Sequence, residues 1–473
     1  MNRQCLACVL AAQVVTVAMA APPDDITRSV STPSAVTYRF SPADEQLLDE
    51  VQRGCFDYFW KETLPPAYVA RDRLKSPVAS VAAVGFQLSG LVIGVERGWI
   101  TRAHGEERTL AILNGLMERK DNHRYGMYLH FVDRATGGLS STNYEVLAST
   151  IDTALLIAGA IPAGEYFGGP VKERVDRLVA EADWRAFVVQ PENVICMGWQ
   201  PADKDHMDGP GHFHRGRWTI SSAEEHLVYW LAVGSPVAEH AVPPELYYRL
   251  ERKVGRHDDM PPFVMSWSGT MFHFFFDHCW IDYRSLGADD PRAFGVDLPR
   301  VDWFENSRRA ALTYRRRCIE ARDRFHTFSE NIWGLSACAG RDGYLVPGLR
   351  PNLANEDKWD DGTVAPYAAA SCIMFTPAES MAAIRAMREL RGKDGTPSAW
   401  RERSAGGYGF VDSFNLDQNF ASDDYVGIDE GPMLLAIENA RTGLIWRLFM
   451  QHPASKLACS RLKLRALPNR QGA

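Results

Sequence analysis

The chain alternates between helical segments that are apolar on nearly every face and helical segments that carry charge along one face. Residues 80–97 and 149–160 are of the first kind, whereas the segment that Thr101 caps is apolar on one side and charged on the other. A helix that is hydrophobic all round has to be enclosed, and an amphipathic helix can enclose it. The alternation therefore predicts two concentric layers, an inner and an outer ring of helices.

Capping signals support this interpretation. Ser41 is a typical N-cap, and Pro42 after it is suited to the first helical position, where an N–H group is not needed. Apolar side chains between residues 47 and 59 then fall on one helical face. Gly98 closes the segment 80–97. We therefore expect well-defined helix starts along this part of the chain.

The overall pattern is that of an all-α protein. Neither a βαβ rhythm nor a GxGxxG loop is present, which argues against a nucleotide-binding fold. Roughly a dozen helical segments fit an (α/α)6 toroid, a barrel of six helical hairpins. Residues 125–132 and 343–346 are expected to form short β-hairpin insertions at its cleft. No internal sequence repeat is visible, so a helical solenoid is the structural alternative.

The N-terminal residues have the composition of a signal peptide. Arg3 lies in a short n-region, an apolar stretch follows, and Ala18-Met19-Ala20 is a small-residue cleavage site, so residues 1–20 are assigned to the signal. Residues 21–39 form a polar leader, and residues 40–473 are interpreted as a single domain because no linker divides them. We expect a monomer exported to the periplasm or the medium, with no later membrane span. The formal net charge of -7 argues against nucleic acid as a partner.

Metal and cofactor sites are not expected. Seven cysteines remain after the signal is removed, an odd number without CxxC spacing, which predicts neither a zinc site nor a dense disulfide framework. The loop 203–214 holds histidines beside aspartates, but it lacks an HExxH pattern and a cysteine ligand. We interpret it as a solvated loop.

Residues 217–236 contain the strongest candidate for an acid catalyst. Their apolar positions predict a helix that starts near Ser221-Ser222 and stops at Gly234-Ser235-Pro236. Glu224 then lies in the first turn, where aromatic neighbours would desolvate its carboxyl, raise its pKa and suit it to donate a proton at neutral pH. The alternative is an acidic residue that only stabilises the helix dipole.

Aromatic side chains gather in polar segments as well as on apolar faces. A flat ring beside carboxylates, arginine and histidine suits a pyranose, because the sugar stacks one face on the ring while its hydroxyls accept and donate hydrogen bonds. Core filling explains many of these rings equally well. The rings are Trp199, Trp218, Trp267, Trp280, Trp333, Trp359 and Tyr425.

Sequence blocks over most of the mature chain resemble the bacterial glycoamylase-like family, which includes endo-β-1,2-glucanases and a domain of cyclic β-1,2-glucan synthases. The blocks keep the family's order and spacing. They are VGFQLSGLVIGVERGWI (84–100), STIDTALLIAGA (149–160), AEEHLVYWLAVGSP (223–236), HCWIDYR (278–284), WFENSRRA (303–310), FSENIWGLSAC (328–338), DDGTVAPYAAA (360–370), YGFVDSFN (408–415) and GIDEGPMLLAIENARTGLIWRLFM (427–450).

The resemblance implies an (α/α)6 barrel that cleaves or transfers β-glucans, with Glu224 as its acid. The neighbouring Glu225 points about 100° away around the helix. A second carboxylate must activate water or attack C1, and the resemblance offers Asp412 first and Glu330 second. The substrate-binding residues it suggests are Asp152, Trp218, His278, Trp280, Asp282, Arg284, Arg308, Trp333 and Asp429, of which Asp429 is also a candidate second carboxylate.

Each candidate has a structural alternative. Glu330 could cap a helix or form a salt bridge, and Asp412 could stabilise a tight turn. Asp152 and Asp429 stand at predicted helix starts, where aspartate is a common cap. The arginines are as compatible with ion pairs as with sugar hydroxyls.

The expected function is an exported glycoside hydrolase that cleaves β-1,2-glucan or its oligosaccharides with acid and base carboxylates and inversion at the anomeric carbon. One alternative is a transglycosylase acting on the same glucan. Another is a non-catalytic glucan-binding or assembly protein, which separated or ion-paired carboxylates would favour.

Overall fold

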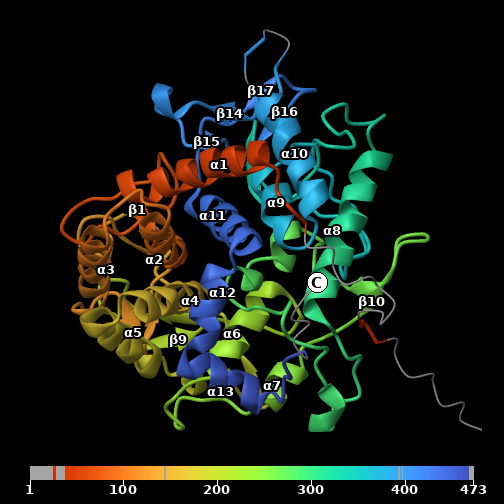
Figure 1. The fold of residues 1–473 in the computed structure, drawn as a ribbon. Coiled ribbons are helices and arrows are strands. Elements are labelled where there is room, and N and C mark those ends of the chain that lie inside the picture. The colour runs from red at the N-terminus through yellow and green to blue at the C-terminus, as the bar shows by residue number, and fades with distance from the viewer. Residues whose placement is uncertain (1–24, 28–37, 143–144, 393–394, 397, 468–473) are drawn as a thin grey trace, which may run out of the picture.

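The computed structural model describes residues 25–27, 38–142, 145–392, 395–396 and 398–467 (Figure 1). The predicted signal peptide and most of the predicted polar leader lie outside these residues. Within them, helices dominate, and every strand is short.

Four long helices, the short helix α9 and a pair of 3-10 turns form an inner ring. Around this ring α2 contacts α4, α4 contacts α6, α6 contacts the turns η2 and η3, α9 contacts α11, and α11 closes back on α2. Figure 1 shows α11, α2, α4 and α6 around the centre of the molecule. The inner elements are α2 (Val81–Glu96), α4 (Thr150–Phe167), α6 (Ala223–Val233), η2 (Met271–Phe274), η3 (Asp277–Cys279), α9 (Pro366–Ser371) and α11 (Gly427–Arg441).

A second layer of helices covers this ring. Among the contacts, α1 packs against α11, α5 against α4, α8 against η2 and α10 against α9. The outer helices are α1 (Pro42–Lys61), α3 (Arg102–Met117), α5 (Gly169–Glu181), α7 (Glu245–Tyr248), α8 (Trp303–Glu320) and α10 (Pro377–Glu389), and α12 (Leu444–Gln451) and α13 (Pro453–Arg461) complete the fold. This is the (α/α)6 toroid that the sequence predicts.

Helix starts agree with the predicted caps. The Ser41 hydroxyl accepts the backbone N–H of Asp44, and Ser80 and Thr101 cap α2 and α3 in the same way. The helix predicted over 149–160 starts as expected but continues to Phe167, because Pro162 is accommodated inside it. Its end coincides with Gly168, which has a positive φ.

Two glycines allow the inner helices α2 and α4 to touch along their backbones. A Cβ atom added to Gly159 would lie 1.8 Å from the carbonyl oxygen of Gly85, and one added to Gly85 would lie 2.1 Å from that of Leu155. Any side chain at either position would overlap backbone atoms. The apolar character of both helices follows from this tight enclosure, since most of their residues are buried.

Backbone hydrogen bonds join the segments that precede the inner helices. Gly427 N–H donates to Asp72 O at 2.8 Å, Val81 N–H to His130 O at 3.0 Å, and Thr150 N–H to Met197 O at 3.1 Å. The starts of α11, α2 and α4 are therefore held side by side. We call this end of the toroid the mouth.

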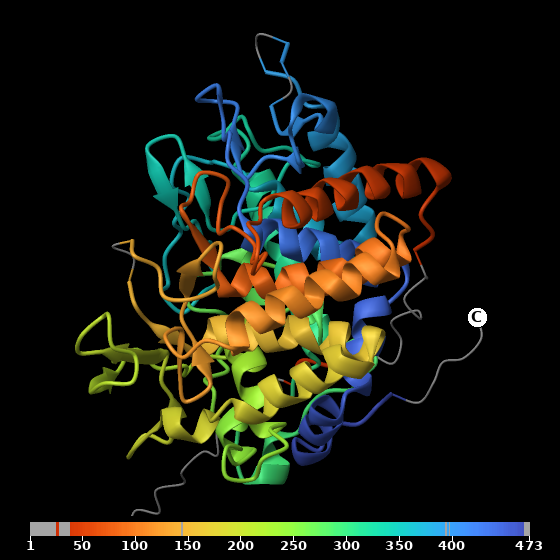
Figure 2. The ribbon, with the colours of Figure 1, turned by 90° about the vertical axis from the view of Figure 1, so that its left-hand side faces the viewer.

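Short antiparallel strands lie in the loops between the helices, and Figure 2 shows hairpins and loops projecting from one side of the helical ring. Both predicted hairpins start earlier in the chain than expected: β2 and β3 pair over 123–128 and β12 and β13 over 338–345, so the predicted ranges 125–132 and 343–346 each hold only part of a hairpin. The strands are β1 (Val78–Ser80), β2 (His123–Arg124), β3 (Met127–Tyr128), β4 (Phe131–Asp133), β5 (Ala148–Ser149), β6 (Val188–Val189), β7 (Val194–Ile195), β8 (Gly198–Pro201), β9 (Gly211–Phe213), β10 (Val254–Gly255), β11 (Phe263–Val264), β12 (Cys338–Gly340), β13 (Gly343–Leu345), β14 (Trp400–Arg401), β15 (Gly409–Phe410), β16 (Phe414–Asn415) and β17 (Phe420–Ala421).

The seven cysteines in the described part of the chain are free thiols, and all but Cys459 are buried. None of the helices in these residues is long and apolar enough to cross a membrane.

Candidate active site

Glu224 lies in the first turn of α6, at the mouth, and its side chain is 21% exposed. Desolvation by burial, followed by the nearby charges of Glu225 and Asp152, raises the pKa of Glu224 to about 8. The carboxyl is therefore protonated at neutral pH while part of its surface is open. Both properties are required of a proton donor to a bound substrate.

His273 is the nearest basic group to this carboxyl, with Nε2 3.8 Å from Glu224 Oε2. Burial lowers the pKa of His273 to about 4, so its ring is neutral at pH 7. An ion pair would need the protonated ring and would lower the pKa of Glu224. The neutral histidine leaves the proton on the glutamic acid.

Glu225 has different surroundings from its neighbour. Its carboxylate accepts a hydrogen bond from the Ser222 hydroxyl and is buried inside the protein. Burial raises the pKa of Glu225 to about 7, with the Ser222 hydrogen bond acting in the opposite direction. The Glu225 side chain is held against its own helix start, so Glu224 is better placed to donate a proton to a substrate.

Asp152 occupies the first turn of α4 and is mostly buried. Its Oδ1 is 3.6 Å from His130 Nε2. Its charge is one of the causes of the raised pKa of Glu224. Trp218 is anchored beside it, because the indole N–H donates to the Thr150 hydroxyl at 2.8 Å. The starts of α4 and α6 thus bring two predicted site residues into electrostatic contact.

Asp412 and Asp429 are neighbouring buried carboxyls that act on each other's pKa. Asp412 precedes β16 and accepts the backbone N–H of Ala339 at 2.7 Å, whereas Asp429 lies in the first turn of α11. Burial raises the pKa of Asp412 to about 6, and the interaction with Asp429 opposes that rise. Burial and the charge of Asp412 raise the pKa of Asp429 well above its usual range. Near pH 7 the pair therefore holds one proton, mainly on Asp429.

Further charged groups surround this pair. Glu430, next to Asp429, is buried, and burial raises its pKa to about 8. Arg73 is the cation of the cluster, and its guanidinium lies 3.3 Å from Asp72. Tyr344 on β13 is 64% exposed, yet desolvation and the Asp429 charge raise its pKa to about 12. The mouth thus carries an ionised acid, several protonated acids and an accessible aromatic ring.

These groups extend along the mouth toward Glu224. Burial raises the pKa of Asp72; the charge of His130 lowers it and that of Asp424 raises it further. His130 is also the residue that faces Asp152. Asp424 in turn influences the pKa of Asp412. His130 and Asp424 thus both act on Asp72, which lies between the surroundings of Asp152 and those of Asp412 in this set of interactions.

Comparison with known proteins places this arrangement in a family. The profile of the Glycoamylase family matches residues 217–453, half of the chain, and this match spans Glu224, Asp412 and Asp429. The chain belongs to the Glycoamylase family.

A curated relative from Parabacteroides distasonis is named exo beta-1,2-glucooligosaccharide sophorohydrolase (non-reducing end). It is 28% identical over 468 residues, which cover 89% of this chain and 58% of the relative. The chain thus spans little more than half the length of the curated relative it matches.

Two solved structures of glucanases share the fold. An endo-beta-1,2-glucanase from Chitinophaga pinensis, in complex with sophorotriose and glucose, superposes with a TM-score of 0.75 at 23% identity, covering 90% of this chain and 99% of that one. A beta-1,2-glucanase from Parabacteroides distasonis superposes with a TM-score of 0.73 at 25% identity, covering 90% and 60%. The structure from Chitinophaga pinensis supports the (α/α)6 toroid over nearly its whole length and over 90% of this chain.

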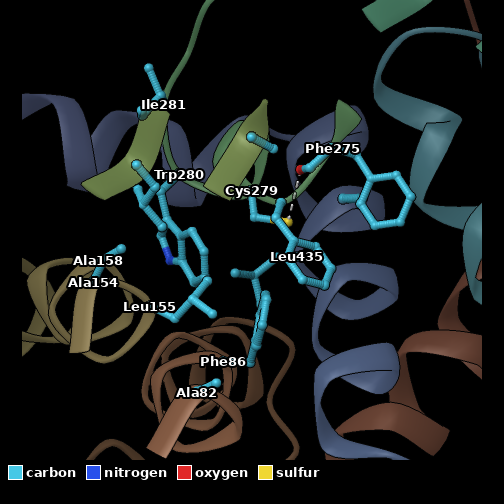
Figure 3. Close-up of a cluster of buried hydrophobic side chains, with 14 of the residues drawn as sticks. Ala82, Phe86, Ala154, Leu155, Ala158, Phe275, Cys279, Trp280, Ile281 and Leu435 are labelled. Carbon is cyan, nitrogen blue, oxygen red and sulfur yellow. Dashed lines mark hydrogen bonds between the residues drawn. The ribbon is translucent and has the colours of Figure 1, made fainter. Parts of the chain in front are cut away.

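Several residues predicted to bind substrate lie in the interior of this Glycoamylase family member. The indole of Trp280 packs 4.8 Å from Phe86 and donates to the Ser89 hydroxyl, so it fills the core between α2 and α4 (Figure 3). Trp333 is also fully buried. Contact with a sugar requires an accessible ring face, so the predicted role of these two rings is corrected to core packing.

His278 is likewise internal. Its Nε2 is 3.0 Å from the Ser307 hydroxyl, and its backbone carbonyl accepts the indole N–H of Trp446. It lines a cavity of about 10 Å³ behind the start of α6, which also involves His226 and Asp277. The predicted substrate contact of His278 is therefore replaced by a structural role beneath the site.

The predicted arginines engage protein carboxylates. Arg308 makes two hydrogen bonds to Glu305, at 2.8 and 3.0 Å. Arg284 lies 3.6 Å from Asp282 and covers the Trp446 ring at 4.6 Å. Both arginines therefore form ion pairs within the protein, as in the structural alternative. Arg284, Arg308 and Asp282 are not part of the candidate site.

Glu330 occupies a surface position. Its side chain is 77% exposed, 3.7 Å from Arg315. It is neither desolvated nor paired with another carboxyl among the described contacts. Glu330 remains a candidate only as the nucleophile of a retaining mechanism.

One group among the described residues has metal-ligand spacing. His257, Asp258 and Glu320 bring their ligand atoms within 4.8 Å of one another, away from the residues above. Glu320 also pairs with Arg316 at 2.7 Å, which describes an exposed ion-pair network.

Sequence reasoning did not find His273, Glu430, Arg73 or His130. Glu430 follows Asp429 directly, and two acids in the first turn of a buried helix could have indicated that both belong to the site. The others lie outside the sequence blocks, and only the folded ring brings them to the mouth.

Proposed function

We propose that this protein is a glycoside hydrolase that cleaves β-1,2-glucan or its oligosaccharides at the mouth of the toroid. The observation that carries the proposal is Glu224, a glutamic acid that is protonated at neutral pH and still partly exposed. Departure of a sugar leaving group requires a proton on the glycosidic oxygen, and such an acid supplies it.

The proposed base is Asp412. In this pair Asp412 has the lower pKa, so it is the ionised member near pH 7 while Asp429 stays protonated. An ionised carboxylate can take a proton from water as that water attacks the anomeric carbon. Asp429 then acts by keeping Asp412 ionised and oriented.

This division of roles favours inversion. Water activated by Asp412 would attack from the face opposite the leaving group, so hydrolysis of a β-glucan would give an α-anomer first. Proton NMR of early products tests this step. A β-anomer appearing first would contradict it and would direct attention to Glu330 as the nucleophile of a retaining mechanism.

The substrate class is supported by the names of the relatives. The curated relative and the glucanase from Parabacteroides distasonis are both named for β-1,2-linked glucans. The proposal also includes export, supported by the signal-peptide composition of residues 1–20.

The deciding experiment measures reducing ends released from linear β-1,2-glucan, with β-1,3- and β-1,4-glucans as comparisons. We expect release from the β-1,2-linked polymer or its oligosaccharides and little from the others. Formation of longer chains without net reducing ends would indicate a transglycosylase. Binding without any product would indicate a glucan-binding protein.

A further inference from the structure

Two aromatic rings, those of Tyr125 and Phe213, lie next to each other on the surface. Tyr125 is 42% exposed and Phe213 is 39% exposed, with ring centroids 6.2 Å apart and planes 20° from parallel. Buried Phe187 supports both, at 6.1 Å from Tyr125 and 5.4 Å from Phe213. Contacts with each other and with Phe187 hold both rings in place while part of each stays exposed.

The backbone holds Tyr125 in an unusual conformation. Strands β2 and β3 pair so that Tyr125 and Gly126 form a two-residue turn, with φ of +53° and +74°. Asparagine and glycine are the residues that favour such a turn. Gly126 is required, because a Cβ there would lie 2.1 Å from the Glu181 carbonyl oxygen. A tyrosine at the first position is strained, and strain of this kind is common where a side chain has a function.

A polar pocket opens beside this ring. It has a volume of about 380 Å³ and is lined by Tyr125, His123, Glu181, Asp183 and His240, among others. His240 Nδ1 is 2.8 Å from the Ala180 carbonyl oxygen, so Nδ1 carries the proton of this hydrogen bond. Two carboxylates in the lining disfavour an anionic ligand. Flat rings next to hydrogen-bonding groups suit a neutral sugar.

The two rings are connected to the mouth. Tyr128, which ends the β2–β3 hairpin, donates its N–H to the Thr153 hydroxyl at 2.7 Å, and Thr153 follows Asp152. His130 is five residues beyond Tyr125, so the chain between them spans at most about 18 Å. Phe213 lies on β9, which pairs with β8, and β8 pairs with β5 at the start of α4. The β2–β3 hairpin contacts α4 next to Asp152 through its last residue, and the β8–β9 hairpin starts at the strand that pairs with β5, just before α4.

We propose that Tyr125 and Phe213, together with this pocket, form a second, non-catalytic binding site for glucosyl units of a polysaccharide whose reacting segment lies at the mouth. The proposal rests on the proposed function for its choice of glucan. The site would hold a long chain near Glu224, and it would raise the local concentration of polymer rather than take part in bond cleavage.

The test compares two double variants. Tyr125→Asn with Phe213→Thr removes both rings, and asparagine fits the positive φ, so the melting temperature is expected to stay at or above that of the parent. Tyr125→Phe with Phe213→Tyr keeps both rings and serves as the matched control. Each pair is made in the parent protein and also with Glu224→Gln, so that binding is measured without turnover.

Linear β-1,2-glucan in affinity electrophoresis and sophorotriose in hydrolysis assays are the probes. We expect the ring-deleted variant to bind the polymer about tenfold more weakly, a few-fold for each ring contact. Its ratio of kcat/KM on polymer to kcat/KM on sophorotriose should fall by a similar factor, whereas the ring-keeping control should retain the parental ratio.

Two results would overturn the proposal. One is equal polymer binding by the parent and the ring-deleted variant, and the other is an equal loss on polymer and sophorotriose, which would place the rings at the reacting segment. If the parent cleaves no β-1,2-glucan, the proposed function fails, and retention on a panel of neutral glucans then tests the site alone. Ring-dependent retention on any of them supports the site, and its absence on all of them rejects it.

Discussion

Glu224 and Glu225 are adjacent in sequence, and their different hydrogen bonds separate their roles. The Ser222 hydroxyl donates to Glu225 and draws that carboxylate toward the helix start. Glu224 faces a neutral histidine and the charge of Asp152 instead. A carboxyl with an anionic neighbour and no cation keeps its proton. The local environment, more than the residue type, makes Glu224 the acid.

Replacing Glu224 with glutamine removes the proton and little else. We expect Glu224→Gln to lower the rate on unactivated glucan by about 10²–10⁴-fold while glucan binding is retained. The matched control is Glu225→Gln, which should cost less because its carboxylate bonds to Ser222. Reducing-end release and affinity electrophoresis measure the two properties. Near-wild-type turnover by Glu224→Gln, with a large loss for Glu225→Gln, would transfer the acid to Glu225.

The pH dependence of kcat/KM should be bell-shaped. Glu224 must be protonated, so its pKa of about 8 predicts a fall in rate above pH 8. The Asp412–Asp429 pair must have lost one proton, so the pKa of about 6 at Asp412 predicts a fall below pH 6. Initial rates of reducing-end release across this range measure both limbs. A rate that stays constant well above pH 8 would mean that Glu224 is not the acid.

At the scale of single elements, the starts of helices were easier to predict than which side chains are buried. Ser41, Ser80 and Thr101 are local signals, because a capping hydroxyl acts on its own helix. Trp280 and Trp333 were predicted wrongly for the converse reason. Their polar sequence neighbours suggested a surface, yet both rings are fully buried, and the indole N–H of Trp280 donates to Ser89 inside the protein.

The contact between α2 and α4 gives a prediction about stability. Gly159→Ala places a methyl group against the backbone of Gly85, so the helices must move apart, at a cost of about 1–3 kcal/mol in the free energy of unfolding. Gly287→Ala is the matched control, because its methyl group would meet the exposed Leu467 side chain at 3.3 Å. Denaturant unfolding of both variants measures the difference. Equal stabilities would show that α2 and α4 can separate without loss.

At the scale of the molecule, the toroid assembles a site from distant segments. Asp412 and Asp429 were each predicted from a sequence block, but their pairing was not, because a hairpin separates them along the chain. Sequence periodicity could indicate the number and kind of helices, and hence the toroid. It could not indicate that β16 brings Asp412 to the start of α11, since that depends on the closure of the ring.

Gathering acids at helix starts should also make the stability of the protein fall as pH rises. Burial raises the pKa of Glu224 and Glu430 to about 8 and that of Glu225 to about 7. Between about pH 4.5 and these values the folded state keeps protons that the unfolded chain has released, so unfolding releases protons and stability decreases with pH. Buried His226 and His273 have lowered pKa values, of about 3 and 4, and act oppositely only below about pH 6.5.

The interval from pH 6.5 to 8 therefore isolates the effect of the buried carboxyls. We expect the melting temperature of the wild type to fall across it, and the variant Glu224→Gln with Glu430→Gln to show a shallower fall, because neither amide titrates. Glu192→Gln, at an exposed position, is the control and should follow the wild type. Differential scanning fluorimetry at constant ionic strength measures the slopes. Parallel slopes for the wild type and the double variant would mean that these two acids are already ionised in the folded protein, and Glu224 could then not be the proton donor at neutral pH.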